Sequence, residues 1–135
     1  MQQDKKIKQD AAAFLGLLGF TVVPSDALLG LCLRRASEYI CNATNQREIP
    51  AGLHMAAVYR VAGEWLRLRH LSGGLSEAEM ENAAAAATKV TEIRESEVTV
   101  KFQADQTAEQ KFVALIESLT LIDGARLARW RRLTW

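Results

Sequence analysis

The sequence contains few residues that interrupt or cross-link a chain. Among its 135 residues are two cysteines, two prolines and eight glycines. Cys32 and Cys41 are too few for the disulfide framework of a small secreted domain, and on a helix their spacing would place them on opposite sides. We therefore expect a reduced, cytosolic chain in which long stretches without proline are free to form helices.

The sequence also lacks an excess of charge of one sign. Lysines and arginines number 17, aspartates and glutamates 16, and the formal net charge is +1. This balance argues against a protein whose main role is to coat nucleic acid. The lysine-rich start at 5–8 is followed directly by Gln9-Asp10 rather than by an apolar core, so we expect no signal peptide. The apolar run at 11–23 is shorter than the roughly 20 residues that a membrane span requires.

Motifs for catalysis are missing as well. The histidines, His54 and His70, fall on nearly opposite sides of one predicted helix and cannot share a metal ion within it. The sequence has no phosphate-binding loop, no dinucleotide-binding glycine motif and no nucleophile elbow. Glu77, Glu79 and Glu81 alternate on a predicted helix and do not converge. We therefore predict no enzyme activity, no metal and no cofactor.

The composition that is present suits one small globular domain. Hydrophobic residues make up 49% of the chain and charged residues 24%, an ordinary globular mixture. A length of 135 residues is enough for one core and too short for two domains. We expect one domain over residues 1–135, with a flexible start at 1–10 and a separate C-terminal tail at 125–135.

Helix signals recur along the chain. A short helix is expected over 11–18, and Asp26 is placed to cap a second helix that ends near Asn45. Pro50 suits the first turn of a long helix reaching Leu71. Ser76 and Glu79 fit a capping box before an alanine-rich helix with little apolar bulk, expected to be mobile or to lie on the surface.

The long helix at 50–71 is apolar on two faces. A stripe through Leu53, Val61 and Trp65 is opposed by a second stripe, with a polar strip spaced for i+3 and i+4 ion pairs between them. Such a helix is either central in the monomer or covered on one face by another subunit. The candidate seam between subunits consists of Met55, Tyr59, Arg60, Glu64, Leu66 and Arg67.

The period of the sequence changes after the alanine run. In an extended chain Val90, Glu92 and Arg94 would point one way and Thr91 and Ile93 the other. Apolar and polar residues alternate over 98–102, and the two segments together predict two short strands around a turn. The predicted class is therefore mainly α: a small helical bundle with one short β-hairpin between the long central helix and the C-terminal helix. The candidate hairpin residues are Ile93, Glu95, Ser96, Glu97, Val98 and Val100.

The tail at 125–135 combines arginine with tryptophan. It allows three interpretations: an amphipathic helix packed on the core with solvated arginines, a segment that docks on a partner, or a nucleic-acid contact. The net charge disfavours the third. The candidate docking residues are Arg126, Arg129, Trp130, Arg131, Arg132, Leu133 and Trp135.

The order of these segments resembles the head–tail connector (adaptor) proteins of long-tailed bacteriophages over residues 20–135. The resemblance lies in Asp26-Ala27-Leu28-Leu29, Tyr39-Ile40, Asn45, Ile49-Pro50-Ala51-Gly52-Leu53, Gly63-Glu64-Trp65-Leu66, the segment 91–102 and the end Trp130-Arg131-Arg132-Leu133-Thr134-Trp135. The turn at Ser96-Glu97 departs from the Gly-Asp usual in that family.

The resemblance implies a structural protein that adds to the portal vertex after DNA packaging. Such subunits form a closed ring of about twelve copies by heterologous contacts, extend the DNA channel and offer a platform for a stopper or tail-completion protein. DNA would only pass through, no membrane would be involved, and the protein would reside in the virion at the head–tail interface after assembly in the bacterial cytoplasm.

A second hypothesis is a small helical nucleic-acid-binding module, such as a packaging or regulatory factor. It is motivated by Arg34, Arg35 and the arginines of the tail. Steeply salt-dependent DNA binding would distinguish it from a connector subunit.

Overall fold

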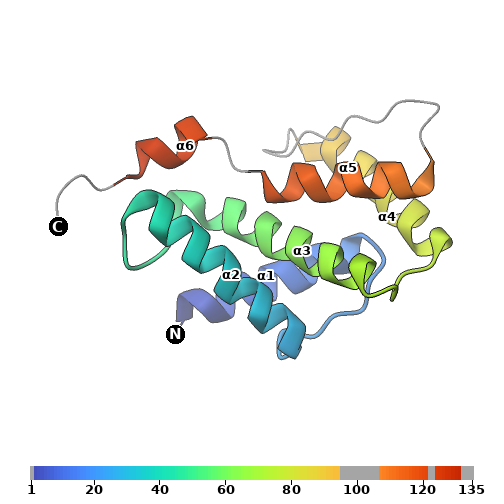
Figure 1. The fold of residues 1–135 in the computed structure, drawn as a ribbon, viewed down its shortest axis with the longest axis horizontal. Helices are drawn as coiled ribbons and strands as arrows, with labels where there is room; N and C mark the ends of the chain where they lie inside the picture. The colour runs from blue at the N-terminus through green and yellow to red at the C-terminus, as the bar shows by residue number, and fades with distance from the viewer. Residues whose placement is uncertain (1, 95–106, 122–123, 132–135) are drawn as a thin grey trace.

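A long helix lies in the middle of the fold and other helices pack around it. In this computed structural model the described residues are 2–94, 107–121 and 124–131, with side chains described for 3–87, 107–121 and 127–131. The elements are α1 (Gln2–Leu17), α2 (Ala27–Thr44), the 3-10 turn η1 (Ala51–Leu53), α3 (His54–Leu71), α4 (Glu77–Arg94), α5 (Ala108–Thr120) and α6 (Gly124–Arg129). Helix α3 contacts α1, α2 and α5, while α4 packs on α5 and α6 on α2 (Figure 1).

The ends of α2 follow the predicted capping signals. The Asp26 side chain accepts a hydrogen bond from the backbone N–H of Leu28 at 2.9 Å, which satisfies one of the free donors of the first turn. At the other end Asn45 adopts a left-handed conformation with φ of 54°, a conformation that asparagine tolerates better than most residues. Both predicted boundaries are confirmed.

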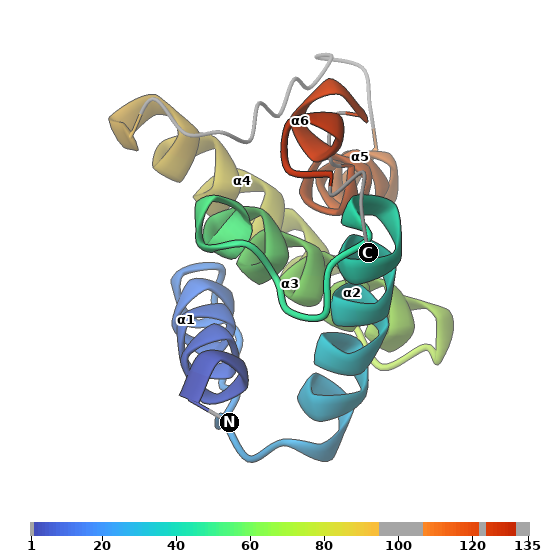
Figure 2. The same ribbon diagram turned by 90° about the vertical axis from the view of Figure 1, so that its left-hand side faces the viewer.

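Helix α1 begins nine residues before the expected short helix. Gln2–Leu17 is one continuous helix, and Ile7 and Leu15 are fully buried against the body. Residues 2–10, expected to be flexible, are therefore helical, because Ile7 supplies an apolar anchor that the charged composition of this segment obscures. Figure 2 shows α1 and α2 on either side of α3.

This placement of α1 covers the second apolar face of α3. Tyr59 and Leu66, two members of the candidate seam between subunits, are buried within the monomer, and the Tyr59 ring meets Phe14 edge to face at 5.3 Å. Met55 is partly buried and packs on the core. The apolar part of the seam is therefore unavailable to a neighbour, and α3 is central in the monomer.

The predicted hairpin is wrong for the part that the structure describes. Residues 90–94, including Ile93, form the last turns of α4, and the described residues contain no strand. Once the alanine run has formed a helix, each further residue adds a hydrogen bond without a new nucleation cost, so the β-branched residues continue it. The remaining hairpin residues, Glu95, Ser96, Glu97, Val98 and Val100, lie outside the described residues.

The alanine-rich helix α4 has a buried face made of small side chains. Ala83 is fully buried, and Ala84, Ala87 and Met80 are at most 8% exposed. Small side chains allow α4 to approach α5 closely, so the helix packs on the body without large apolar groups.

Candidate functional site

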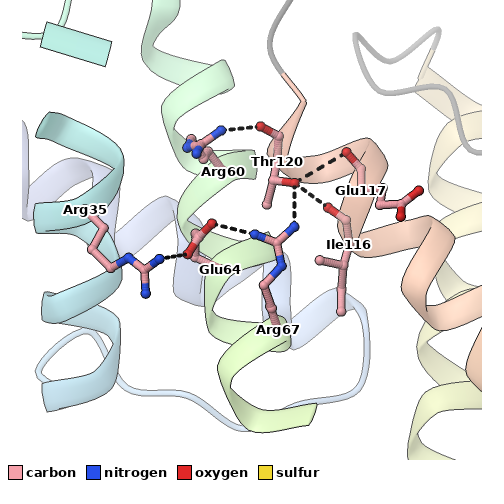
Figure 3. A network of polar contacts seen from close by, with 7 residues as sticks. All are labelled: Arg35, Arg60, Glu64, Arg67, Ile116, Glu117 and Thr120. Carbon is pink, nitrogen blue, oxygen red and sulfur yellow. Dashed lines mark hydrogen bonds and ion pairs between the residues drawn. The ribbon is translucent and has the colours of Figure 1, made fainter. Parts of the chain in front are cut away.

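A buried ion pair occupies the polar strip of α3. Glu64 is 2% exposed, and its Oε1 accepts a hydrogen bond from Nη1 of Arg67 at 3.0 Å. Arg35 of α2 approaches Oε2 of Glu64 to 3.4 Å (Figure 3). The predicted i+3 pair is therefore confirmed, but Glu64 also joins two helices. The two guanidinium groups compensate the hydration that the buried carboxylate has lost.

The end of α5 is attached to the same strip through Thr120. Arg60 donates from Nη1 to the backbone oxygen of Thr120, and Arg67 donates from Nη2 to Thr120 Oγ1 at 3.2 Å. Thr120 Oγ1 in turn donates to the backbone oxygen of Ile116 at 3.0 Å (Figure 3). Arg60 therefore reaches α5 rather than forming the i+4 pair with Glu64 that its spacing allows.

Helix α5 approaches this strip because α3 carries a glycine. A Cβ atom at Gly63 would lie 2.7 Å from Cγ2 of Thr120 and 2.9 Å from Cβ of Leu119. Non-bonded contacts of a Cβ atom are essentially never this short, so the absent side chain sets the distance between the helices. Gly63 thereby places Thr120 within reach of both arginines.

A groove opens above the ion pair between α2 and α5. Its cavity volume is about 440 Å³, and it is lined by Tyr39, Arg60, Arg67, Glu117, Thr120 and Leu121. The Arg60 guanidinium stacks 3.8 Å above the Tyr39 ring, a cation–π contact. Leu121 is 78% exposed and Tyr39 41% exposed. The groove thus combines guanidinium groups with uncovered apolar surface.

This arrangement suits binding of an anionic group better than acid–base chemistry. Glu64 is engaged by Arg35 and Arg67. Cys32 of α2 is fully buried. Its burial, and to a smaller extent the negative charge of Glu64, raise the pKa of the thiol to about 12. Cys32 is therefore no nucleophile at neutral pH. Within the described residues no group of three His, Cys, Asp or Glu side chains is placed to hold a metal ion.

A larger cavity, about 600 Å³, opens between α1 and α2, and its charged lining residues are of both signs. Asp4 and Lys8 line it from α1, and Arg34 and Glu38 from α2. The mixture gives it no preference for ligand charge. The groove above Glu64 is therefore the stronger candidate site.

The two histidines have separate roles between helices. His54 Nε2 lies 2.7 Å from Oδ2 of Asp10 and joins α3 to α1. His70 Nε2 lies 3.4 Å from Oε1 of Glu109 and its ring meets Phe112 edge to face. Each histidine thus contacts a different helix.

The described part of the tail packs back on the body. Leu127 is buried and Trp130 is 37% exposed. The Trp130 ring lies on Gly52, where a Cβ atom would collide with it, and the Gln46 side chain donates to the backbone oxygen of Trp130.

The structure describes some of the other tail residues and not the rest. Arg129 and Arg131 are exposed. The side chain of Arg126 and all of Arg132, Leu133 and Trp135 lie outside the described residues. For the residues that are described this is the amphipathic arrangement: apolar side chains on the body, arginines in solvent.

Several contacts of the candidate site join residues far apart in the sequence. The pairs are Arg35 with Glu64, Arg60 with Tyr39, and Arg67 with Thr120. Local spacing indicated only the partnership within α3. A weak signal for the rest was the polar strip itself, because a charged row between two apolar stripes requires partners on other elements.

No protein-family model, curated protein or solved structure gave a match to this chain. In the part of the chain that the structure describes, every helix is too short or too polar to cross a bilayer.

Proposed function

We propose that this chain is a structural subunit of a phage or prophage head–tail connector. The observation that carries the proposal is the series of connector-like motifs in order over residues 20–135. Two of these motifs occupy structurally demanding positions. Asp26 caps α2, and Gly63-Glu64 forms the point where α2, α3 and α5 meet.

The surface adds a second line of support. Arg129 and Arg131 are exposed beside the partly exposed Trp130, and arginine with tryptophan is the combination enriched at the centres of protein interfaces. In the proposed assembly this end of the chain docks on the portal. The buried second face of α3 no longer supports self-association, which must use other surfaces.

The nucleic-acid alternative has less support among the described arginines. Arg35 pairs with Glu64, and Arg34 lies in a cavity with Asp4 and Glu38. The charge of Arg35 is therefore compensated, whereas Arg34, Arg129 and Arg131 are exposed. DNA binding that weakens steeply with salt would nevertheless favour this alternative.

The proposal is tested with the portal protein encoded in the same genome. The full chain should co-purify with assembled portal rings and appear as an added ring in electron micrographs. The double variant Arg129→Glu/Arg131→Glu should lose most of this binding, because it reverses two exposed charges of the docking end.

The matched control is Lys5→Glu/Lys6→Glu, which reverses two exposed charges on α1 and should bind normally. Failure of the unmodified chain to bind the portal contradicts the connector function. Equal loss in both double variants contradicts the docking role of the tail.

A further inference from the structure

The groove between α2 and α5 has more cationic than anionic groups. Arg60 and Arg67 are seven positions apart on α3, a rise of about 10 Å along one side of the helix, and both line the groove. Glu64 lies between them but is buried and bound by Arg67 and Arg35. The carboxylate of Glu117 points away from both groove arginines (Figure 3). An anionic group is therefore the complementary ligand.

The rim of the groove also identifies the class of ligand. Leu121 and Tyr39 leave apolar surface uncovered beside the arginines. A small inorganic anion would leave this surface wet, whereas a protein segment with carboxylates on an apolar backbone would cover it. The combination of Tyr, Arg and an exposed aliphatic side chain is typical of an interface centre.

The chain itself carries an exposed acidic segment, in which Ala78 is the exposed apolar residue. Glu77, Glu79 and Glu81 are all exposed within the first five positions of α4. Glu79 accepts a hydrogen bond from the backbone N–H of Ser76 in the capping box. Glu77 and Glu81 are therefore the two glutamates available for contact with the groove. Glu77 and Glu81 are four residues apart and therefore share one side of the helix.

The acidic start of α4 and the groove are different surfaces of the molecule. Helix α4 begins beyond the end of α3, at the right of Figure 1, whereas the groove is lined from α2, α3 and the end of α5. The two share no residue. A copy can therefore offer its α4 to one neighbour while its own groove receives another.

We propose that the groove binds the first five residues of α4 of a second copy, with Glu77 and Glu81 against Arg60 and Arg67. The proposal rests on the proposed connector function and specifies its contact between subunits. Because two different surfaces meet, the contact is heterologous, adds copies in one direction and closes into a ring if the rotation between copies permits.

The first test measures self-association by sedimentation velocity up to about 1 mM protein, where even weak contacts are populated. Leu121→Glu puts a negative charge at the groove without disturbing the core. Glu77→Lys/Glu81→Lys reverses the charge of the α4 segment and keeps the capping box. Each should weaken association by about tenfold or more, because Leu121→Glu adds a like charge beside the glutamates of α4 and the two lysines would face Arg60 and Arg67. Val23→Glu, a matched change of an exposed apolar residue outside the groove, should associate normally.

The second test mixes the two impaired proteins in equal amounts. The Leu121→Glu copy keeps a working α4, and the double variant keeps a working groove. The mixture should therefore form one-to-one pairs and nothing larger, a result specific to a heterologous contact.

Three results overturn the contact: no association of the unmodified chain, association unaffected by both variants, or no pairs on mixing. Disruption by Leu121→Glu alone means that another acidic segment occupies the groove, which overturns the assignment to α4.

Rings that bind the portal despite both variants leave the connector function standing. One-to-one pairs without portal binding leave the contact standing and contradict the connector function.

Discussion

At the scale of single residues, the absent side chain at Gly63 decides how α3 and α5 meet. Gly63→Ala should lower the free energy of unfolding by about 1–3 kcal/mol, the usual cost of overpacking a tight interface, because the new Cβ would collide with Thr120 and Leu119. Urea unfolding followed by circular dichroism measures this loss.

Gly16 provides the control for this substitution. It lies in α1, and a Cβ atom added there would meet nothing within 4 Å, so Gly16→Ala should stabilise by about 0.5–1 kcal/mol through helix propensity alone. Equal effects at both positions would show that packing at Gly63 is not tight.

Cys32 gives the fold a dependence on alkaline pH. The pKa of its thiol is raised from 9.0 to about 12 by burial and by Glu64, so the folded chain keeps a proton that the unfolded chain loses. The contribution of the protonated thiol to the free energy of unfolding is fully present below about pH 9 and is lost as pH rises toward about 12. Between about pH 8 and pH 10 the unmodified chain should lose up to about 1.4 kcal/mol more than Cys32→Ala, by urea unfolding at both values. Identical losses would contradict the raised pKa.

Residue-level predictions succeeded where the partner is close in sequence. The capping residues Asp26 and Ser76 and the pair Glu64–Arg67 depend on spacings of two to three residues, which a sequence displays directly. The link from Arg60 to Thr120 spans 60 positions and depends on how α5 lies on α3. No local pattern encodes that distance.

At the scale of elements, α6 is held to the body by few contacts. Gly52→Val should displace Trp130, whose ring occupies the space of the new side chain, and thereby release α6 from α2. Limited trypsin digestion should then cut faster at Arg129 and Arg131, while the thermal unfolding of the other helices changes little. Unchanged cleavage would show that the contact of Trp130 with Gly52 is not needed to hold α6.

The alanine-rich element shows why sequence periods mislead. Residues 90–94 were predicted as a strand, yet they extend α4, because the helix nucleated at Ser76 continues more easily than a new strand starts. The same element buries Ala83 and Ala87, whose contribution to packing depends on how close α5 comes rather than on their own bulk.

At the scale of the whole molecule, the enclosure of α3 predicts an order of local opening. Helix α3 is covered by α1, α2 and α5, whereas α4 packs mainly on α5. Backbone amides of α3 should therefore exchange with solvent last and those of α4 among the first, because local opening is cheapest where few buried contacts are lost. Native-state hydrogen exchange measures the order; equal protection of both helices would contradict it.

The bare backbone on which the indole of Trp130 rests has an evolutionary consequence. Any side chain at position 52 would collide with the Trp130 ring where it now lies, so the two sites should vary together. Related sequences with a larger residue at position 52 should have a smaller residue at position 130. This covariation would indicate that the C-terminal helix packs on its own subunit.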